Sequence, residues 1–355
     1  MKICVVGGNG NIGYSIARQL LAFGYEVTCF NRGLSGPAPD GAKTILGDRH
    51  HRDEFERLMQ AEKFDAAIDM FCFTHEDALS SIRAFQGVRH FVNCSTVATY
   101  GREFDCLPTT EEYPLRPTSD YGVKKAQADQ VFLDAYRTIG FPATIIKPSL
   151  TYGTRYGLPR QIGYSLVWLD RIRKGMPIVV SGDGTTIQQF MHVDDAGLAF
   201  ALIVGKAKCI GQTYNLVHQG FTQWDSYYRT VMRVLGRDVN MVGVPAADII
   251  ALRDSGFLNT DDIPSHNSFF CADKLSRDVP EFVQHVSLEA RIQQVIEALD
   301  KEGRIPNADN HDWEDRLIKA QLNVRTLKSL KNLKPWLKKY CPDPLYNYLR
   351  RNFST

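Results

Sequence analysis

Short apolar runs alternate with amphipathic stretches along the first 150 residues of the chain. Apolar runs of four to eight residues predict buried strands, because a strand covered on both faces shows no polar alternation. Such strands are expected at residues 3–6, 26–30, 43–46, 64–71, 89–94 and 143–147. Apolar positions at helical spacing predict helices between them, at residues 14–23, 53–61, 75–85 and 119–139. This alternation predicts an α/β protein with a doubly wound parallel sheet.

A glycine-rich loop joins the first predicted strand to the first predicted helix. Gly7, Gly10 and Gly13 form the pattern Gly-x-x-Gly-x-x-Gly. The missing side chains let the backbone turn sharply and approach a pyrophosphate, with a helix N-terminus directed at it. Between a strand and a helix, the pattern predicts a dinucleotide site in a Rossmann-type fold.

The regular alternation ends after about residue 150. Helical spacing recurs at residues 163–174, 196–204, 223–235 and 286–299, and strand-like runs at residues 177–180, 190–193 and 212–217. Asp194 or Asp195 can cap the helix at 196–204. We therefore predict a Rossmann domain at residues 1–165 that also receives about 186–210. A smaller α+β substrate-binding lobe is predicted at 166–185 and 211–310, and a basic extension at 311–355.

The end of the second predicted strand bears on the choice of cofactor. Asn31-Arg32-Gly33 follows that strand. An acidic residue here would bind the ribose hydroxyls of NAD, whereas an arginine suits the 2′-phosphate of NADP. The sequence therefore favours NADP(H) over NAD(H). The alternative is that Arg32 stacks on the adenine or faces solvent.

Tyr121 and Lys125 lie near the start of the helix predicted at 119–139. Residues four apart share one face of a helix, with Cβ atoms about 6 Å apart. A nearby ammonium favours the phenolate and is expected to lower the tyrosine pKa below its usual value of about 10. The pair is a candidate general acid or base for a sugar or alcohol hydroxyl. The alternative is a half-buried tyrosine beside a solvated lysine.

Further motifs follow the same order as in a known family. They are Ser95-Thr96 with Tyr100-Gly101, Pro148 with Tyr152-Gly153, and Gly182-Asp183-Gly184 with Phe190-x-His192-Val193-Asp194-Asp195. Together with the glycine loop and Tyr121-x-x-x-Lys125, they cover about residues 1–300. Over this length the chain resembles the extended short-chain dehydrogenase/reductase family, also called the NAD-dependent epimerase/dehydratase family.

The resemblance implies a role for each matching position. Tyr121 would be the general base or acid, Lys125 would hold the nicotinamide ribose, and Thr96 would hydrogen-bond the reacting oxygen. With Asn31 and Arg32, the expected cofactor contacts are Gly7, Gly10, Asn11, Ile12, Gly13, Asp48, Lys125 and Pro148. The expected substrate contacts are Thr96, Tyr121, Tyr152 and Gln188. Hydride would pass between a substrate carbon and the nicotinamide.

Departures from the family pattern narrow the function. Val97-Ala98 stand where dehydratases of the family carry Asp-Glu, so dehydration is not expected. Gln188 replaces an arginine that binds the diphosphate in sugar-nucleotide epimerases, and Lys147 replaces another arginine. With these two arginines replaced, a substrate diphosphate would be bound by Arg155, Arg160, Arg171 or Arg173, or the substrate has no diphosphate.

Phe71-Cys72-Phe73 stands where the family has a turn of small residues. This segment either narrows the cofactor channel or simply packs.

Composition is ordinary for a globular protein: 355 residues, 44% hydrophobic and 23% charged. No apolar run reaches the roughly 18 residues of a membrane-spanning helix, and the first strand leaves no room for a signal peptide. The eight cysteines are scattered without a Cys-x-x-Cys pair, and several lie in apolar, strand-like runs. We therefore expect a cytoplasmic protein with reduced thiols and no metal site.

A charge asymmetry distinguishes the C-terminal part. Residues 316–355 carry ten Lys or Arg and one acidic residue, a net charge of +9; the total of +2 leaves −7 for the rest. Leucines three or four residues apart alternate with lysines. Such a tail could contact an anionic membrane, nucleic acid or a second subunit, or form a docked or solvated helix. We expect a small-molecule substrate and a homodimer.

Two hypotheses remain. The first is an NAD(P)-dependent epimerase or carbonyl reductase acting on a sugar nucleotide or related polyol, by tyrosine-mediated proton transfer coupled to hydride transfer. The second is a non-catalytic, RNA- or membrane-associated scaffold, because the chloroplast stem-loop binding proteins of this family resemble the chain at Asn31-Arg32-Gly33. The set of Thr96, Tyr121 and Lys125 favours the enzyme, since a scaffold has no need of all three.

Overall fold

The computed structural model describes residues 1–251, 263–284 and 286–323. Its central element is a seven-stranded parallel sheet with strand order β11-β6-β5-β4-β1-β2-β3. The strands are β1 (Lys2–Val6), β2 (Glu26–Asn31), β3 (Lys43–Leu46), β4 (Ala66–Asp69), β5 (His90–Cys94), β6 (Ala143–Pro148) and β11 (Thr213–Leu216). The strand order reverses between β1 and β4, which confirms the predicted doubly wound fold and creates a crevice for ligands there.

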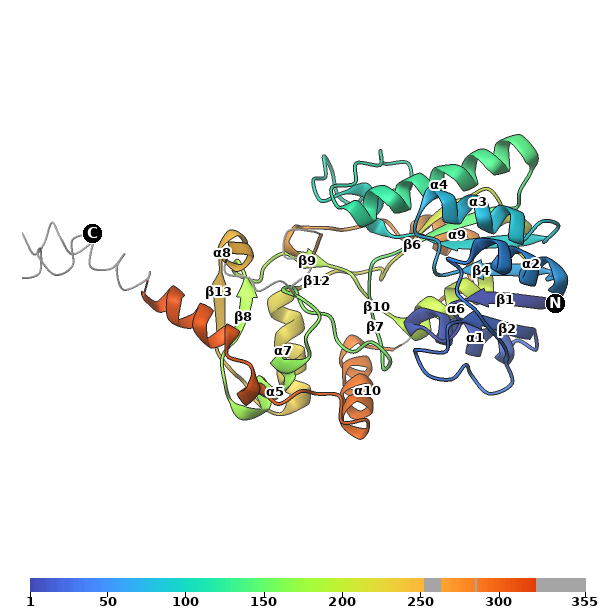
Figure 1. Ribbon diagram of the computed structural model, residues 1–355. Helices are drawn as coiled ribbons and strands as arrows, with labels where there is room; N and C mark the ends of the chain where they lie inside the picture. The colour runs from blue at the N-terminus through green and yellow to red at the C-terminus, as the bar shows by residue number, and fades with distance from the viewer. Residues whose placement is uncertain (252–262, 285, 324–355) are drawn as a thin grey trace, which may run out of the picture.

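Helices cover both faces of this sheet (Figure 1). One face carries α1 (Asn11–Ala22) and α6 (Val193–Ile203), and the other carries α2 (Arg52–Glu62), α3 (His75–Ala84) and α4 (Asp120–Ile139). Strand β1 serves both cores: Ile3 and Val5 point to the α1 side, whereas Cys4 and Val6 point to the other. The reason is that successive side chains of a strand face opposite ways.

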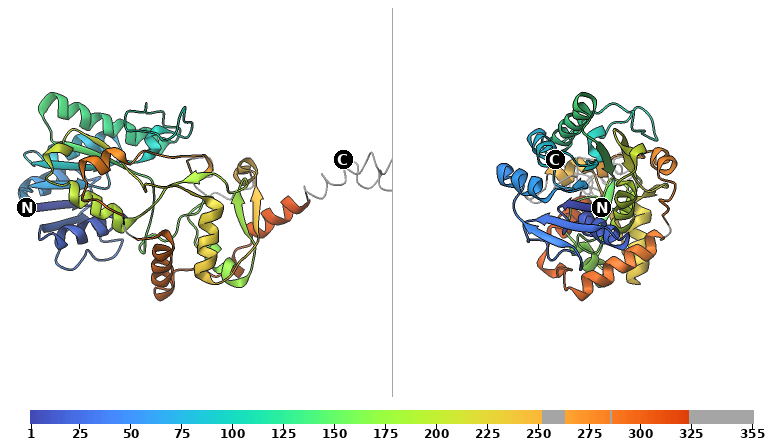
Figure 2. Two further views of the ribbon diagram at one scale, coloured as in Figure 1. Left: turned by 180° about the vertical axis from the view of Figure 1, so that it is seen from behind. Right: turned by 90° about the vertical axis from the view of Figure 1, so that its right-hand side faces the viewer.

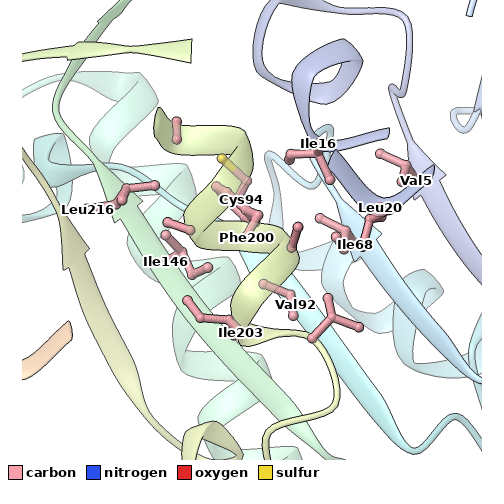
Figure 3. Packing of buried hydrophobic residues seen from close by; sticks show 14 of the residues in the cluster. Val5, Ile16, Leu20, Ile68, Val92, Cys94, Ile146, Phe200, Ile203 and Leu216 are labelled. Carbon is pink, nitrogen blue, oxygen red and sulfur yellow. The ribbon is translucent and has the colours of Figure 1, made fainter. Parts of the chain in front are cut away.

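The core between α6 and the sheet is dense and apolar. Phe200 and Ile203 of α6 lie over Val92 of β5 and Ile146 of β6 (Figure 3). Burial of each such side chain contributes about 1.5–3 kcal/mol to stability. This core therefore holds rigid the strand ends from which the loops of the candidate site emerge.

A smaller α+β lobe lies beyond the carboxyl ends of the sheet strands (Figures 1 and 2). The parallel strands β8 (Ile178–Ser181) and β13 (Met241–Val244) pair there beside α5 (Val167–Lys174), α7 (Trp224–Leu235) and α10 (Leu288–Lys301). Two short pairs are β7 (Leu150–Tyr152) with β10 (Phe190–His192), and β9 (Ile187–Gln188) with β12 (Thr222–Gln223). The lobe core is aromatic, and the rings of Trp168, Phe190 and Trp224 each contact Tyr227.

The remaining described elements are short. They are α8 (Ala246–Ala251), α9 (Asp273–Asp278), and the 3₁₀ turns η1 (Val97–Tyr100), η2 (Ala207–Cys209), η3 (Ile263–Ser265) and η4 (Ala308–Asn310). Residues 313–323 are helical, and Leu317 packs beside Val179 and Val244 of the smaller lobe. The rest of the basic extension, residues 324–355, lies outside the described residues. No helix in the described ranges is long and apolar enough to cross a membrane.

Two details differ from the sequence-based expectations. Strand β11 pairs with β6 at the edge of the main sheet, whereas the predicted division placed residues 211–310 in the smaller lobe. The α6 helix begins at Val193 and is capped by His192, whose Nδ1 accepts a hydrogen bond from the amide of Asp194 at 3.2 Å. An apolar run does not reveal which sheet a strand joins, and several neighbouring polar residues can serve as a cap.

Candidate active site

The glycine loop brings β1 and the start of α1 into close contact. A Cβ at Gly13 would lie 2.1 Å from the carbonyl oxygen of Gly7, closer than any side chain can approach. Gly7 has a φ of +84°, a conformation that favours glycine. The N-terminus of α1 therefore lies directly against the loop, an arrangement that binds phosphate groups.

A cavity of about 630 Å³ borders this loop and holds the predicted reacting groups. Thr96 caps η1, because its Oγ1 accepts a hydrogen bond from the amide of Ala98 at 3.2 Å. Ser119 caps α4 in the same way, accepting from the amide of Gly122 at 3.2 Å, and so fixes the turn that carries Tyr121. The wall of this cavity includes Gly7, Gly10, Asn11, Ile12, Gly13, Thr96, Tyr121 and Pro148. The structure thus gathers eight predicted site residues from four separate segments.

Lys125 lies beneath the cavity and does not line it. Its side chain is buried, and its Nζ donates to the carbonyl oxygens of Cys72 at 2.8 Å and Cys94 at 2.6 Å. The ammonium also lies 4.5 Å from the ring centre of Phe73. Through these two hydrogen bonds, Lys125 connects the loop after β4 to the end of β5. Its expected contact with a nicotinamide ribose stays a prediction.

Burial sets the ionisation of Tyr121. The residue is 45% exposed, yet restricted contact with water within the cavity raises the pKa of its phenol. The charge of Lys125 and a hydrogen bond with Thr96 act in the opposite direction but do not reverse the effect. The pKa of Tyr121 is therefore raised, not lowered as expected from the lysine alone. At neutral pH the phenol keeps its proton.

A buried ion pair supports Thr96 from behind. Lys147 of β6 is paired with Asp129 of α4, and its Nζ also donates to Thr99 Oγ1 at 2.7 Å. Thr99 in turn donates to the carbonyl oxygen of Thr96 at 2.9 Å. Ser95 adds a hydrogen bond of 2.7 Å to Asp129. The lysine that replaces the family arginine therefore holds the backbone around Thr96.

A second cavity, of about 250 Å³, lies beside the end of β2. Its wall includes Gly7, Asn31, Arg32 and Asp48. Asn31 Oδ1 accepts from the amide of Gly33 at 2.8 Å, whereas its buried Nδ2 has no hydrogen-bond partner. Arg32 lies 3.9 Å from Asp48, and both side chains are partly exposed. Asn31 and Arg32 are therefore two of the donor side chains that border this cavity.

The two cavities together fit a dinucleotide. They are adjacent, because Gly7 and Phe71 line both. The glycine loop lies between the donors of the smaller cavity and Tyr121 in the larger one, as an adenosine, a pyrophosphate and a nicotinamide require. Asn11 Oδ1, in the wall of the larger cavity, is also buried without a hydrogen-bond partner. Unsatisfied buried polar atoms cost free energy, and a bound polar ligand would relieve that cost.

Phe71 occupies the boundary between the cavities. A Cβ added to Gly7 would lie 2.4 Å from its ring, so the phenyl group packs directly on the glycine loop. Asp69 accepts from the amide of Phe71 at 2.9 Å and binds Arg49 at 2.8 Å. Phe71 therefore packs on the glycine loop and lines both cavities, whereas the expected narrowing of the cofactor channel stays a prediction.

Tyr152 and Gln188 lie away from the large cavity. Tyr152 is buried in the core of the smaller lobe, with its ring centre 5.2 Å from that of His192. Gln188 is also buried, donates to the carbonyl oxygen of His266 at 2.8 Å, and accepts from Ser268 at 3.1 Å. The structure places neither side chain in the wall of the large cavity, against the sequence-based expectation. Motif spacing located both residues near the site but could not show which way they face.

The arginines considered for a diphosphate already have partners. Arg160 binds Glu314 with distances of 2.9 and 2.6 Å, Arg171 binds Asp315 at 3.0 and 2.7 Å, and Arg173 binds Asp300 at 2.7 and 2.6 Å. Each pair is bidentate, the strongest arrangement for arginine and carboxylate. These three guanidinium groups are therefore committed within the smaller lobe.

The side chain of Arg155, the fourth arginine considered, contacts the Rossmann domain. Its guanidinium donates to the carbonyl oxygens of Asn9 at 3.2 Å, Ser35 at 2.6 Å and Pro37 at 3.1 Å. It also stacks 3.8 Å from the ring centre of Tyr14. Arg155 therefore ties the segment after β7 to the glycine loop and to the loop after β2.

Several side chains in the cavity wall were not predicted from the sequence. They are Ser119, Thr151, Tyr156, Gln161 and Tyr164, most of them on the segment that follows β6. Tyr156 and Tyr164 form an edge-to-face pair with ring centres 5.6 Å apart. The sequence did offer one indication of these residues: their segment follows a predicted strand, and ligands bind at the carboxyl ends of the strands in such sheets.

Comparison with known proteins agrees with this geometry. The sequence model of the "NAD dependent epimerase/dehydratase family" matches residues 3–80 and 74–216. The 2′-dehydrokanamycin reductase of Streptomyces kanamyceticus is 30% identical over 312 residues, which are 87% of this chain and 87% of that protein. The chloroplast stem-loop binding protein of 41 kDa b of Arabidopsis thaliana is 27% identical over 66% of this chain and 63% of that protein.

A solved structure shows the same fold. The UDP-glucose 4-epimerase of Thermotoga maritima, with UDP-glucose, superposes with a TM-score of 0.69 at 21% identity. The superposition covers 85% of this chain and 99% of the epimerase.

Proposed function

Because the chain belongs to the NAD-dependent epimerase/dehydratase family of enzymes, we propose that it is an NADP(H)-dependent carbonyl reductase acting on a sugar or related polyol. The relative with the widest sequence match described above is named as a reductase. The position of Tyr121 carries the proposal: it lines one cavity with Thr96 and the glycine loop, and a phenol that is protonated at neutral pH can donate to a carbonyl oxygen.

The reaction divides between cofactor and protein. The reduced nicotinamide supplies a hydride to the carbonyl carbon when bound. Tyr121 donates its proton to the carbonyl oxygen, so the C=O double bond becomes an alcohol and the phenolate is reprotonated from solvent. Thr96 holds the same oxygen by a hydrogen bond, and the charge of Lys125 stabilises the transient phenolate.

Replacement of Tyr121 tests the proton transfer. Tyr121→Phe is expected to lower kcat for carbonyl reduction by at least about 100-fold, because general acid catalysis contributes roughly that much. NADPH affinity, measured by fluorescence titration, is expected to stay within about twofold, since the phenol oxygen makes no cofactor contact in this proposal. Tyr136→Phe, on the same helix but outside the cavity, is the control. Full turnover by Tyr121→Phe would refute the mechanism.

The preference for NADP(H) is supported by the two donors beside the smaller cavity. Asn31 Nδ2 and Arg32 suit the acceptor oxygens of a 2′-phosphate. Arg32→Ala is expected to weaken NADPH binding at least about tenfold and to leave NADH binding unchanged, as measured by calorimetry. The control is Arg89→Ala, which removes an exposed arginine outside both cavities. Equal affinity of the unmodified protein for NADH and NADPH would contradict the assignment.

Epimerisation is a second candidate that uses the same groups. It requires the cofactor to stay bound between two hydride transfers, and the contacts of Arg155 across the glycine loop favour retention. The two candidates differ in what remains bound on purification. Tightly held oxidised cofactor supports an epimerase, whereas exchangeable NADPH supports a reductase. A homodimer is also proposed for either enzyme, and sedimentation measurements test it.

A further inference from the structure

Half-exposed aromatic rings gather around the large cavity. Phe71 is 39% exposed, Tyr121 45%, Tyr156 42% and Tyr164 51%, and all four line it. Aromatic surface left in contact with water is unfavourable, so such a cluster in a concave site indicates a surface for a ligand. Tyr156 and Tyr164 come from the segment after β7, whereas Tyr121 comes from α4. A ring bound between them would have its reacting carbon near Tyr121 and Thr96.

The described part of the wall of this cavity has almost no net charge. Among its lining residues within the described ranges, Arg160 alone has an ionised side chain. Its guanidinium binds both carboxylate oxygens of Glu314 and donates to the carbonyl oxygen of Val179 at 3.1 Å. Glu314 is buried and also accepts from the amide of Val179 at 2.8 Å. The carboxylate therefore neutralises the arginine inside the protein.

This neutrality limits the ligands that can bind. In the part of the cavity away from the glycine loop, a diphosphate would need cationic donors and an ammonium group would need carboxylates, because an unpaired buried charge is strongly unfavourable. The other polar side chains of the described wall are neutral, among them Ser119, Ser149 and Thr151, whereas Gln161 is already hydrogen-bonded to Thr186, Pro264 and Ser181. Neutral donors and acceptors match the hydroxyl groups of a sugar.

We propose that the part of the cavity facing Tyr121 binds an uncharged sugar or cyclitol ring against Tyr156 and Tyr164, and not a nucleotide diphosphate sugar or an amino sugar. This inference rests on the proposed function, because it names the substrate class that Tyr121 and Thr96 reduce. Glu314 then has a defined role: it keeps Arg160 from attracting anions, and so selects an uncharged substrate.

A matched series of ligands tests the charge preference. Glucose, protonated glucosamine, glucose 1-phosphate and UDP-glucose share one ring and differ in charge. Their dissociation constants for the NADP⁺-loaded protein are measured by ligand-observed NMR. Glucose is expected to bind at least about tenfold more tightly than each charged relative, the cost of burying an unpaired charge. Tighter binding of either phosphate compound or of glucosamine, or no binding of glucose, would overturn the proposal.

Tyrosine variants test the aromatic surface. Tyr156→Leu and Tyr164→Leu are expected to weaken glucose binding about threefold to tenfold each, whereas Tyr156→Phe and Tyr164→Phe keep the rings and stay within about twofold. Tyr136→Leu, on an exposed part of α4 outside the cavity, is the control and leaves binding unchanged. Unaltered glucose binding by both leucine variants would reject the aromatic contact.

Glu314→Gln tests the selection against anions. It leaves Arg160 without its carboxylate and is expected to shift preference toward glucose 1-phosphate. Asp315→Asn is the matched control, because it removes the neighbouring carboxylate, whose partner Arg171 does not line the cavity. If Glu314→Gln does not fold, the ligand series and the tyrosine variants decide the matter. These measurements follow equilibrium binding, so their failure is distinguishable from a failure of Tyr121→Phe to abolish turnover.

Discussion

Burial is the main cause of the pKa shifts of several ionisable residues in this protein. His90, at the start of β5, is 1% exposed and lies in hydrogen-bonding distance of Thr144 Oγ1 at 2.8 Å and the amide of Gly205 at 3.0 Å. Burial lowers the pKa of His90 to about 4, so the ring is neutral in the folded protein. The unfolded chain, with a histidine pKa of about 6.5, takes up a proton at higher pH.

This difference predicts an acid-sensitive stability. Because the folded pKa lies below the unfolded value, the contribution of His90 is complete above about pH 6.5 and is lost as the pH falls toward 4, by up to about 3 kcal/mol. Chemical denaturation at several pH values measures this slope. His90→Gln is expected to flatten it in part, since burial also lowers the pKa of His192 to about 4.

The control for this prediction is His75→Gln. Its side chain is 51% exposed, so its removal is expected to leave the slope unchanged. An equal slope for the His90→Gln variant and the unmodified protein would contradict the assignment of a buried neutral imidazole.

Burial also determines the direction of the pKa shift of Tyr121, the proposed proton donor. Spacing was enough to place Tyr121 and Lys125 on one helix turn, and their approach is visible in the electrostatic effect of one on the other. The direction of the tyrosine pKa was not predictable from that pair, because most of the desolvation comes from segments distant in sequence. The lysine itself is held by backbone oxygens of Cys72 and Cys94, which no sequence pattern indicated.

The sequence predicted which helices and strands are present more reliably than where each of them begins and ends. A strand was expected at residues 64–71, whereas β4 spans Ala66–Asp69. It pairs with β1 and β5 only over those four residues, so its neighbours set its ends. Similarly, a helix was expected at 163–174, but α5 starts at Val167, and the preceding residues line the cavity instead. Hydrophobic spacing reports the core of an element and not its limits.

At the scale of the whole molecule, the segment after β7 is held against the Rossmann domain by side-chain contacts. Arg155 supplies several of these, and Arg304 fixes its backbone by donating to the carbonyl oxygens of Thr154 at 2.6 Å and Arg155 at 2.7 Å. The loop after β2 lines the smaller cavity through Leu34 and Ser35. We therefore expect that release of a bound cofactor requires this loop to move against the contacts of Arg155.

Arg155→Ala is expected to accelerate NADPH dissociation at least about fivefold, because it removes charged hydrogen bonds worth about 1 kcal/mol or more to the closed arrangement. Stopped-flow displacement of bound NADPH measures the rate. Arg137→Ala is the control, since its side chain is 65% exposed and pairs within α4. An unchanged dissociation rate would show that the loop after β2 does not limit release.

The start of the basic extension is also part of the folded molecule. Its helical start, residues 313–323, is part of the smaller lobe, where Glu314 and Asp315 bind arginines. The expected contacts of the remaining tail with a membrane, nucleic acid or a second subunit stay predictions, because residues 324–355 lie outside the described residues.

The sequence by itself determined the alternating fold, the glycine loop and the identities of Thr96, Tyr121 and Lys125. These features are local: each depends on residue types at fixed spacing within one strand, turn or helix. Only the tertiary structure decided that Gln188 and Tyr152 face away from the cavity, and that Arg160 is neutralised by Glu314. Arg160 and Glu314 are far apart in the chain, and their pairing depends on how the C-terminal segment folds back onto the smaller lobe. The positions of the proposed reacting groups were therefore predictable, whereas the charge that we propose for the substrate depended on packing.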